Sequence, residues 1–221
     1  MKADSVTAPR ILVLASGSGT NLQALINASR ERDFPGQIVA VGCNRPGAFA
    51  LERAAQANID TFTVDHTHYG SREEFDGALM AEIRRHNPDL IVLAGFMRIL
   101  TTDFVRALRG TMLNVHPSLL PKYTGLKTHQ RALDAGETTH GVSIHFVTEE
   151  LDGGPVIAQE RVPVLPTDTA SELAARVAAK EHLVYPHVVT WFAAGRLRMQ
   201  DNRAYLDDEP LPPTGLEIKP A

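Results

Sequence analysis

The chain has 221 residues, of which 43% are hydrophobic and 22% are charged, and its formal net charge is -4. A chain of this size can bury a substantial core, in one domain with tails or in two small domains. Acidic and basic residues are mixed along the sequence, which argues against a nucleic-acid-binding protein, since such proteins usually present a basic face. A small anionic ligand needs only a local positive site and is not excluded.

The single cysteine, Cys43, indicates the compartment. One cysteine cannot form an intrachain disulfide, so we expect a reducing, cytoplasmic location. Cys43 lies in the apolar run of residues 38–43 and is expected to be a small buried strand residue rather than a reactive thiol. The first ten residues lack the apolar segment of a signal peptide, and no run approaches the ~18 apolar residues of a membrane helix. We therefore expect neither export nor membrane insertion.

The first half of the chain alternates short apolar runs with amphipathic segments. In chain order these predict a strand at 11–15, a helix at 21–32, a strand at 38–43, a helix at 48–57, a strand at 61–64, a helix at 72–86, and strands at 89–94 and 112–115. The side chains expected to be buried on the first two helices are Leu22, Leu25 and Ile26, then Phe49, Leu51 and Ala55. Such alternation indicates βαβ units and a mostly parallel sheet.

The pattern changes after residue 115. It predicts longer strands at 141–147 and 155–164, a long helix at 171–191 interrupted near Pro186, and a short strand at 196–199. Residues 207–221 hold four prolines and little apolar pattern, which indicates a loose tail. We expect a tail at 1–9, one domain at 10–205 and a tail at 206–221. The predicted fold is three-layer α/β, a mostly parallel twisted sheet with helices on both faces and a Rossmann-like amino-terminal half.

A glycine-rich turn, SGSGTN at residues 16–21, separates the first strand from the first helix. Free N–H groups and the partial positive charge of a helix amino terminus suit a phosphate there, and glycines allow close approach. The alternative is a tight turn with a helix cap. The spacing is neither a Walker loop nor the dinucleotide fingerprint, which would also want an acidic residue where this chain has Asn44 and Arg45.

The run NVHPSLLP, residues 114–121, follows the fifth strand. A histidine at a strand's carboxyl end can move protons at neutral pH, and Asn114, two residues before His116, points to the same face. Together they could stabilise an oxyanion. The alternative is a loop histidine satisfied by backbone groups. Asp152, in the turn DGGP, is either a turn former or a carboxylate that favours the charged form of His116.

The other polar and aromatic residues of note show no pattern typical of a metal or binding site. His66 and His68 lack ligand partners nearby, and the nine histidines show no zinc spacing with cysteine, so we expect a polar loop and no metal site. Trp191 and Phe192 are expected in the core rather than on a stacking platform.

Four motifs together resemble the folate-dependent formyltransferases, in particular the phosphoribosylglycinamide formyltransferase family. They are residues 16–21, LAGFMRIL at 93–100, NVHPSLLPKY at 114–123 and LDGGP at 151–155, in matching order and separation over about residues 10–200. The resemblance implies the formyltransferase fold. It implies transfer of the formyl group of 10-formyltetrahydrofolate, as co-substrate, to the amine of phosphoribosylglycinamide in purine biosynthesis. Partners are small molecules, and the chain is expected to be a monomer or homodimer.

The resemblance also implies residue roles. It brings Asp152 to His116 and assigns catalysis to Asn114, His116 and Asp152. It assigns the acceptor to Gly19, Thr20, Asn21 and Glu181. It assigns the folate to Arg72, Met97, Arg98, Ile99 and Leu100, with Asn114, Glu149, Glu150, Leu151 and Asp152. No covalent intermediate is implied, which agrees with the lack of an activated Ser or Cys pair.

The chain departs from the family at three positions: Thr124 stands where proline is frequent, Lys127 where histidine is common, and Thr20 where serine is frequent. Three other functions are weighed. A methionyl-tRNA formyltransferase is expected to carry a further carboxyl-terminal RNA-binding domain, and a formyltetrahydrofolate hydrolase a further amino-terminal domain. A silent phosphate-binding module would keep the glycine turn without needing Asn114, His116 and Asp152 together.

Overall fold

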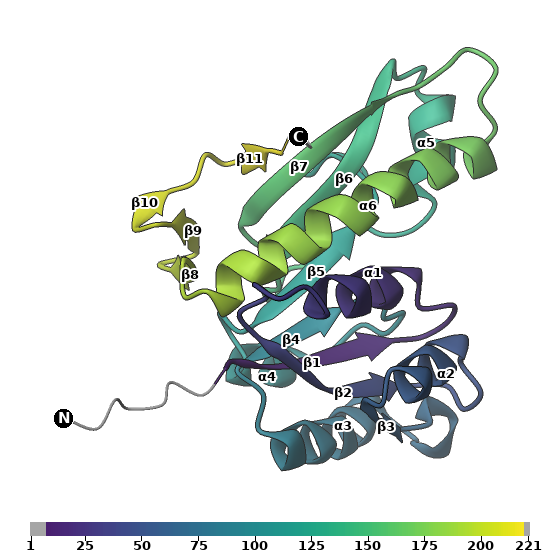
Figure 1. The fold of residues 1–221 in the computed structure, drawn as a ribbon. Helices are drawn as coiled ribbons and strands as arrows, with labels where there is room; N and C mark the ends of the chain where they lie inside the picture. The colour runs from purple at the N-terminus through teal and green to yellow at the C-terminus, as the bar shows by residue number, and fades with distance from the viewer. Residues whose placement is uncertain (1–7, 219–221) are drawn as a thin grey trace.

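The structure is a computed structural model that describes residues 8–218. Eight strands form one sheet in the order β11-β7-β6-β5-β4-β1-β2-β3 (Figure 1). Their bounds are β1 (Arg10–Ala15), β2 (Gln37–Cys43), β3 (Asp60–Thr63), β4 (Leu90–Leu93), β5 (Met112–His116), β6 (Thr139–Phe146), β7 (Val156–Pro163) and β11 (Leu216–Glu217). A smaller antiparallel sheet holds β8 (Leu197–Gln200), β9 (Arg203–Leu206) and β10 (Glu209–Pro210).

The large sheet is mostly parallel. Strands β3, β2, β1, β4 and β5 run parallel to one another, β6 is antiparallel to both β5 and β7, and β11 is parallel to β7. The helices are α1 (Thr20–Ser29), α2 (Phe49–Gln56), the 3-10 turn η1 (His66–His68), α3 (Arg72–His86), α4 (Thr102–Ala107), α5 (Thr128–Asp134) and α6 (Ala170–Ala193). The helices α4 and α5 are not among the predicted elements.

Each face of the sheet is covered by its own set of helices, because side chains alternate along a strand. Ile11 and Val13 of β1 belong to a core shared with α1, α2 and α6. Leu12 and Leu14 belong to a second core with α3 and α4. Figure 1 shows α6 lying along one face, with α1 beside it. The predicted three-layer fold is therefore confirmed.

The predicted interruption of the long helix is wrong, because α6 continues through Pro186. Proline removes one backbone donor from a helix, a local loss that tertiary contacts can outweigh. Here Tyr185 is fully buried, and its hydroxyl lies within hydrogen-bond distance of two strand carbonyls, those of Leu93 (3.1 Å) and Leu113 (2.9 Å). These contacts anchor the helix to the sheet beside the proline.

The burial predicted for α1 is confirmed, since Leu22, Leu25 and Ile26 are buried. For α2 the prediction is wrong at Phe49, which is 46% exposed, and at Ala55, which is exposed, whereas Leu51 packs partly buried against the core. The fully buried residues of this helix are Ala50 and Ala54. At Ala50 the helix approaches the glycine turn closely, since a Cβ atom added at Gly19 would lie 2.8 Å from it. Only small residues fit that contact.

The predicted loose tail is wrong for the residues that the structure describes. Leu216 pairs with Ala158 of β7, and Leu211, Leu216 and Ile218 pack against the main core. The prolines rule out a helix here, but they tolerate an edge strand, and Pro210 lies in β10. Most of the predicted amino-terminal tail, residues 1–7, and residues 219–221 lie outside the described residues. Within residues 8–218, no helix is both long and apolar enough to span a bilayer.

Candidate active site

The predicted site residues gather where neighbouring strands end. The register aligns Leu14 of β1 with Leu93 of β4, and Leu93 with Asn114 of β5. The segments that follow these strands therefore leave the sheet at one edge. In open α/β sheets that edge, outside the carboxyl ends of the strands, is where ligands bind.

The glycine turn forms the amino terminus of α1. Gly19 is the N-cap residue with φ 71° and ψ 34°, a left-handed conformation that favours glycine, and no side chain caps the helix. The first turn also holds no acidic residue. A cavity of about 260 Å³ opens here, lined by residues 16–21 together with Arg45, Ala94, Gly95 and Met97. The uncapped N–H groups favour the anion-site interpretation over a merely capped turn.

Helix α2 holds the glycine turn in place. The Ala50 N–H donates to the Gly17 carbonyl (3.0 Å), and Arg53 Nε donates to the Ser18 carbonyl (2.8 Å). A Cβ atom added at Gly19 would lie 2.8 Å from both the Cα and the Cβ of Ala50. The turn thus needs glycine both for its conformation and for the contact with α2.

Asn21 and Glu181, 160 residues apart in sequence, meet beside this cavity. Asn21 Nδ2 donates to Glu181 Oε2 at 2.6 Å. Burial raises the pKa of Glu181, and the hydrogen bond from Asn21 opposes that shift. The structure therefore brings together two of the residues expected to hold the acceptor.

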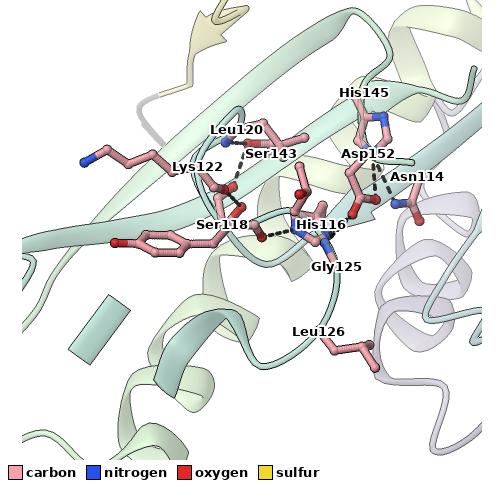
Figure 2. A network of polar contacts seen from close by, with 12 residues as sticks. Asn114, His116, Ser118, Leu120, Lys122, Gly125, Leu126, Ser143, His145 and Asp152 are labelled. Atoms are coloured by element: carbon pink, nitrogen blue, oxygen red, sulfur yellow. Dashed lines mark hydrogen bonds and ion pairs between the residues drawn. The ribbon is translucent and has the colours of Figure 1, made fainter. Parts of the chain in front are cut away.

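Asp152 and His116 also meet, as predicted. His116 ends β5 and is 5% exposed, and its Nδ1 lies 3.5 Å from Asp152 Oδ2. Figure 2 shows Asp152 between His116 and Asn114. His116 Nε2 donates to the Tyr123 carbonyl (2.8 Å), since a carbonyl can only accept. The ring thus has its Nε2–H engaged by the backbone and its Nδ1 facing the Asp152 carboxylate.

The turn that carries Asp152 is fixed by its glycines and by a backbone contact. Asp152 has φ 53°, which aspartate tolerates better than most residues. A Cβ atom at Gly154 would overlap the Phe146 carbonyl, so the turn can press against β6 only with glycine there. Asp152 Oδ2 accepts a hydrogen bond from the Gly125 N–H (2.8 Å). The carboxylate thereby joins the loop after β5 to the connection between β6 and β7.

A second cavity, about 140 Å³, lies on the other side of the segment after β4. Six of the residues predicted to bind folate line it beside Asn114 and Asp152, namely Arg98, Ile99, Leu100, Glu149, Glu150 and Leu151. Two predicted folate residues lie elsewhere. Met97 lines the glycine-turn cavity, and Arg72 lines an adjoining cavity of about 650 Å³ that shares Ile99, Leu100 and Glu149.

A model of the formyl transferase family matches residues 9–189. This chain belongs to the formyl transferase family. The phosphoribosylglycinamide formyltransferase of Escherichia coli (strain K12) is 53% identical over 205 residues, covering 93% of this chain and 97% of that protein. That of Haemophilus influenzae is 46% identical over 206 residues, with the same coverage.

Solved structures give the same result. The phosphoribosylglycinamide formyltransferase of Coxiella burnetii superimposes with a TM-score of 0.91 at 51% identity, covering 96% of this chain and 99% of that one. The family and fold inferred from the four sequence motifs are therefore confirmed.

The active-site region of this formyl transferase holds a residue that sequence reasoning missed, His145 of β6. Its Nδ1 donates to the Phe146 carbonyl (2.9 Å), so its Nε2 accepts from Asn114 Nδ2 (3.1 Å). Burial lowers the pKa of His145 to about 4, which keeps the ring neutral and able to accept. A polar residue within an apolar strand was a signal, but only the antiparallel register sets His145 opposite Asn114.

A buried polar network fixes the formyl transferase loop that follows His116. Ser143 Oγ donates to the Ser118 carbonyl (2.6 Å) and accepts from the Leu120 N–H (2.9 Å) and from Gln159 Nε2 (2.9 Å). Buried polar groups of this kind are costly unless each has a partner, so a satisfied network specifies one loop conformation. At Thr124, where the family often has proline, Arg131 Nη1 donates to the carbonyl (2.6 Å).

The remaining sequence interpretations concern side chains away from this loop. Cys43 is a buried strand residue, as predicted, and burial raises its pKa to about 11. Trp191 is buried in the core, also as predicted. His66 lies in a turn, where its Nδ1 donates to the Asn44 carbonyl (2.7 Å). Across residues 8–218 no three His, Cys, Asp or Glu side chains gather closely enough to hold a metal ion.

Proposed function

We propose that this formyl transferase transfers the formyl group of 10-formyltetrahydrofolate to the amine of phosphoribosylglycinamide, giving the N-formyl product in de novo purine biosynthesis. The observation that carries the proposal is the arrangement of two cavities around one edge of the sheet. Residues 94, 95 and 97 line the cavity at the glycine turn, and residues 93, 96 and 98 line the cavity beside Asn114 and Asp152. Near-full-length identity of 53% to a protein named for this reaction supports it.

In this proposal the phosphate end of the acceptor binds at the amino terminus of α1. Gly19, Thr20 and Asn21 supply donors there, and Thr20 keeps a hydroxyl where family members often have serine. Glu181, oriented by Asn21, accepts hydrogen bonds from the ribose hydroxyls. The acceptor's amine then extends past residues 94–97 toward His116. This order places the reacting amine away from the phosphate anchor.

The folate occupies the second cavity and the larger cavity that adjoins it. The residues from 98 to 100 and from 149 to 152 form its walls, and Arg72 lies on the adjoining cavity. The formyl group then lies beside Asn114 and Asp152, which line that cavity. A guanidinium such as that of Arg72 suits the carboxylates at the far end of a folate.

The proposed chemistry is a direct attack. The acceptor nitrogen bonds to the formyl carbon, and the carbonyl electrons move to oxygen to form a tetrahedral oxyanion. Asn114 Nδ2 carries two protons; one is donated to His145, so the other is available to the oxyanion. His116 is the second donor through Nδ1, because its Nε2 already donates to the Tyr123 carbonyl, and the Asp152 carboxylate lies 3.5 Å from that Nδ1.

Collapse of the intermediate restores the carbonyl and breaks the bond from the formyl carbon to the folate nitrogen. The attacking nitrogen loses a proton and the folate nitrogen gains one, through His116 or an ordered water. The balance needs neither a covalent enzyme intermediate nor a metal ion. We also propose a cytoplasmic location without nucleic-acid or membrane partners, and the lone buried thiol of Cys43 supports a reducing compartment.

The test is an assay of the purified chain with 10-formyltetrahydrofolate and phosphoribosylglycinamide, in which both tetrahydrofolate and the N-formyl product are measured. Stoichiometric release of both products is the expected result. A reaction without acceptor separates transfer from hydrolysis, and a reaction with initiator methionyl-tRNA separates it from tRNA formylation. Folate consumption that does not depend on the glycinamide acceptor would overturn the proposal.

A further inference from the structure

The cavity at the glycine turn is lined by one basic residue, Arg45, among glycines, small polar residues, Ala94 and Met97. Arg45 follows β2 and lies in the turn that leads to α2. The sequence singles it out because the dinucleotide-binding pattern would have an acidic residue near this position. Its charge has the opposite sign, and it faces the same cavity as the uncapped end of α1.

The backbone at Arg45 is tied to the glycine turn through its neighbour Asn44. Asn44 is 1% exposed, and its Oδ1 accepts from Ser16 Oγ at 2.5 Å. Ser16 Oγ in turn accepts from the Met97 N–H at 2.7 Å. A proline follows Arg45 and restricts its backbone to extended conformations. These contacts hold the base of the Arg45 side chain at a fixed place on the rim of the cavity.

A second arginine beside the same turn, Arg53, is held by its neighbours. Its Nε donates to the Ser18 carbonyl (2.8 Å), its Nη1 donates to Gln23 Oε1 (3.0 Å), and its guanidinium lies 4.7 Å from the centre of the Phe49 ring. Arg45 differs: it is exposed, and residues 8–218 give its guanidinium no hydrogen bond or ion pair. One arginine shapes the turn, and the other is available to a ligand.

The charge at this cavity also favours a role for Arg45. A phosphate monoester carries a charge of about -1.5 to -2 at neutral pH, whereas a helix amino terminus offers the equivalent of roughly +0.5. Asn21, which lines the cavity, is bonded to the Glu181 carboxylate and so brings a negative group nearby. The helix terminus alone leaves most of the phosphate charge uncompensated. A guanidinium can pair with two phosphate oxygens at once.

We propose that Arg45 binds the phosphate of the acceptor directly and makes the enzyme select phosphorylated over unphosphorylated acceptors. This inference rests on the proposed function, because it takes the acceptor to be a phosphoribosyl amine. Arg53 differs, because its Nε is already committed to the Ser18 carbonyl of the turn.

The test compares two acceptors, phosphoribosylglycinamide and the same riboside without phosphate, across four proteins. These are the wild type, Arg45→Ala, Arg45→Lys and the control Arg32→Ala, which removes the same charge from an exposed position beyond the other end of α1. A charge-assisted hydrogen bond implies that Arg45→Ala lowers kcat/KM for the phosphorylated acceptor roughly 10- to 100-fold, mainly through KM. Arg45→Lys keeps the positive charge but cannot pair with two phosphate oxygens at once. Its kcat/KM for the phosphorylated acceptor should therefore lie between those of the wild type and Arg45→Ala.

The riboside should react about equally well with wild type and Arg45→Ala, and Arg32→Ala should match wild type with both acceptors. Inhibition by inorganic phosphate gives a second measurement, and its inhibition constant should rise in Arg45→Ala. An equal loss with both acceptors, or an unchanged KM and phosphate inhibition, would overturn the role of Arg45. If the wild type formylated neither acceptor, the proposed function itself would fail, which is a distinguishable result.

Discussion

The glycine turn and the histidine site lie at one edge of the sheet but are built differently. The turn at residues 16–21 is contiguous in sequence and presents backbone N–H groups. The histidine site takes Asn114 and His116 from β5, His145 from β6 and Asp152 from the following turn, and their side chains are largely buried (Figure 2). One region depends on local conformation, and the other on how β5, β6 and a distant turn are placed.

This difference predicts how substitutions in each region affect the enzyme. A side chain changed in the histidine site leaves its buried partners without hydrogen bonds or charge compensation, so effects should be large and coupled. A change in the turn alters backbone conformation or a single contact, so effects should be smaller and confined to the acceptor. Four experiments, taken in order of decreasing expected effect, examine this contrast.

The largest effect is expected from the pair His116 and Asp152. His116→Ala and Asp152→Asn should each lower kcat roughly 100- to 10,000-fold, the range of a general acid–base group. Because the two side chains meet at 3.5 Å, the double variant should lose much less than the product of the single losses. Steady-state kinetics measures this, with folate binding and thermal unfolding as controls. Near-native turnover in either single variant would contradict the pairing.

The second-largest effect concerns the stability of the folded chain at acid pH, to which His140 contributes. Burial, and then the neighbouring His129, lowers the pKa of His140 from 6.5 to about 4. As the pH falls, His140 takes up a proton in the unfolded chain before it does so in the folded chain. Its contribution to the free energy of unfolding is therefore complete above about pH 6.5 and is lost as the pH falls toward 4. At about 1.4 kcal/mol for each pH unit, His140 alone contributes a loss of about 3 kcal/mol.

His140→Gln, which cannot titrate, should flatten that pH dependence. Urea unfolding between pH 7.5 and 4.5 measures it, and His68→Gln, at a histidine whose side chain is 77% exposed, is the matched control. His145, with its pKa also lowered to about 4, should leave part of the slope in place. An unchanged slope in His140→Gln would mean that this ring is protonated in the folded chain at mildly acid pH.

A smaller effect is expected from Gly19→Ala. The left-handed conformation costs a residue other than glycine about 1–2 kcal/mol, and the new Cβ would also press on Ala50 at 2.8 Å. Gly47→Ala is the matched control, because Gly47 has the same φ of 71° but open space around it. Gly19→Ala should raise the acceptor KM and spare the folate KM. Equal behaviour of the two variants would show that contact with α2 is unimportant.

The fourth prediction is that metal removal has no effect on activity. The proposed chemistry uses Asn114, His116 and Asp152, so exhaustive dialysis against a chelator should leave kcat unchanged. Metal analysis of the dialysed protein confirms that removal was complete. Activity that falls on dialysis and returns with zinc or magnesium would refute a mechanism carried by side chains alone.

The sequence by itself determined the elements whose signals are local. Apolar runs predicted the strands of the parallel half, and the four-residue spacing of Phe75, Leu79 and Ile83 predicted α3 with its observed bounds. The glycine turn was visible because a βα connection and its helix terminus are contiguous. The meeting of His116 with Asp152 came from family resemblance, since spacing alone cannot bring residues 36 positions apart together.

Tertiary structure decided what depends on distant contacts. Helix α6 continues through Pro186 because the hydroxyl of Tyr185 meets the sheet. The described part of the proline-rich end, up to residue 218, joins the sheet because Leu216 pairs with Ala158 of β7. The partner of Asn114 is His145 only because β5 and β6 run antiparallel in one register. Register and docking arise from burial and pairing summed over the whole chain, so no local window of sequence contains them.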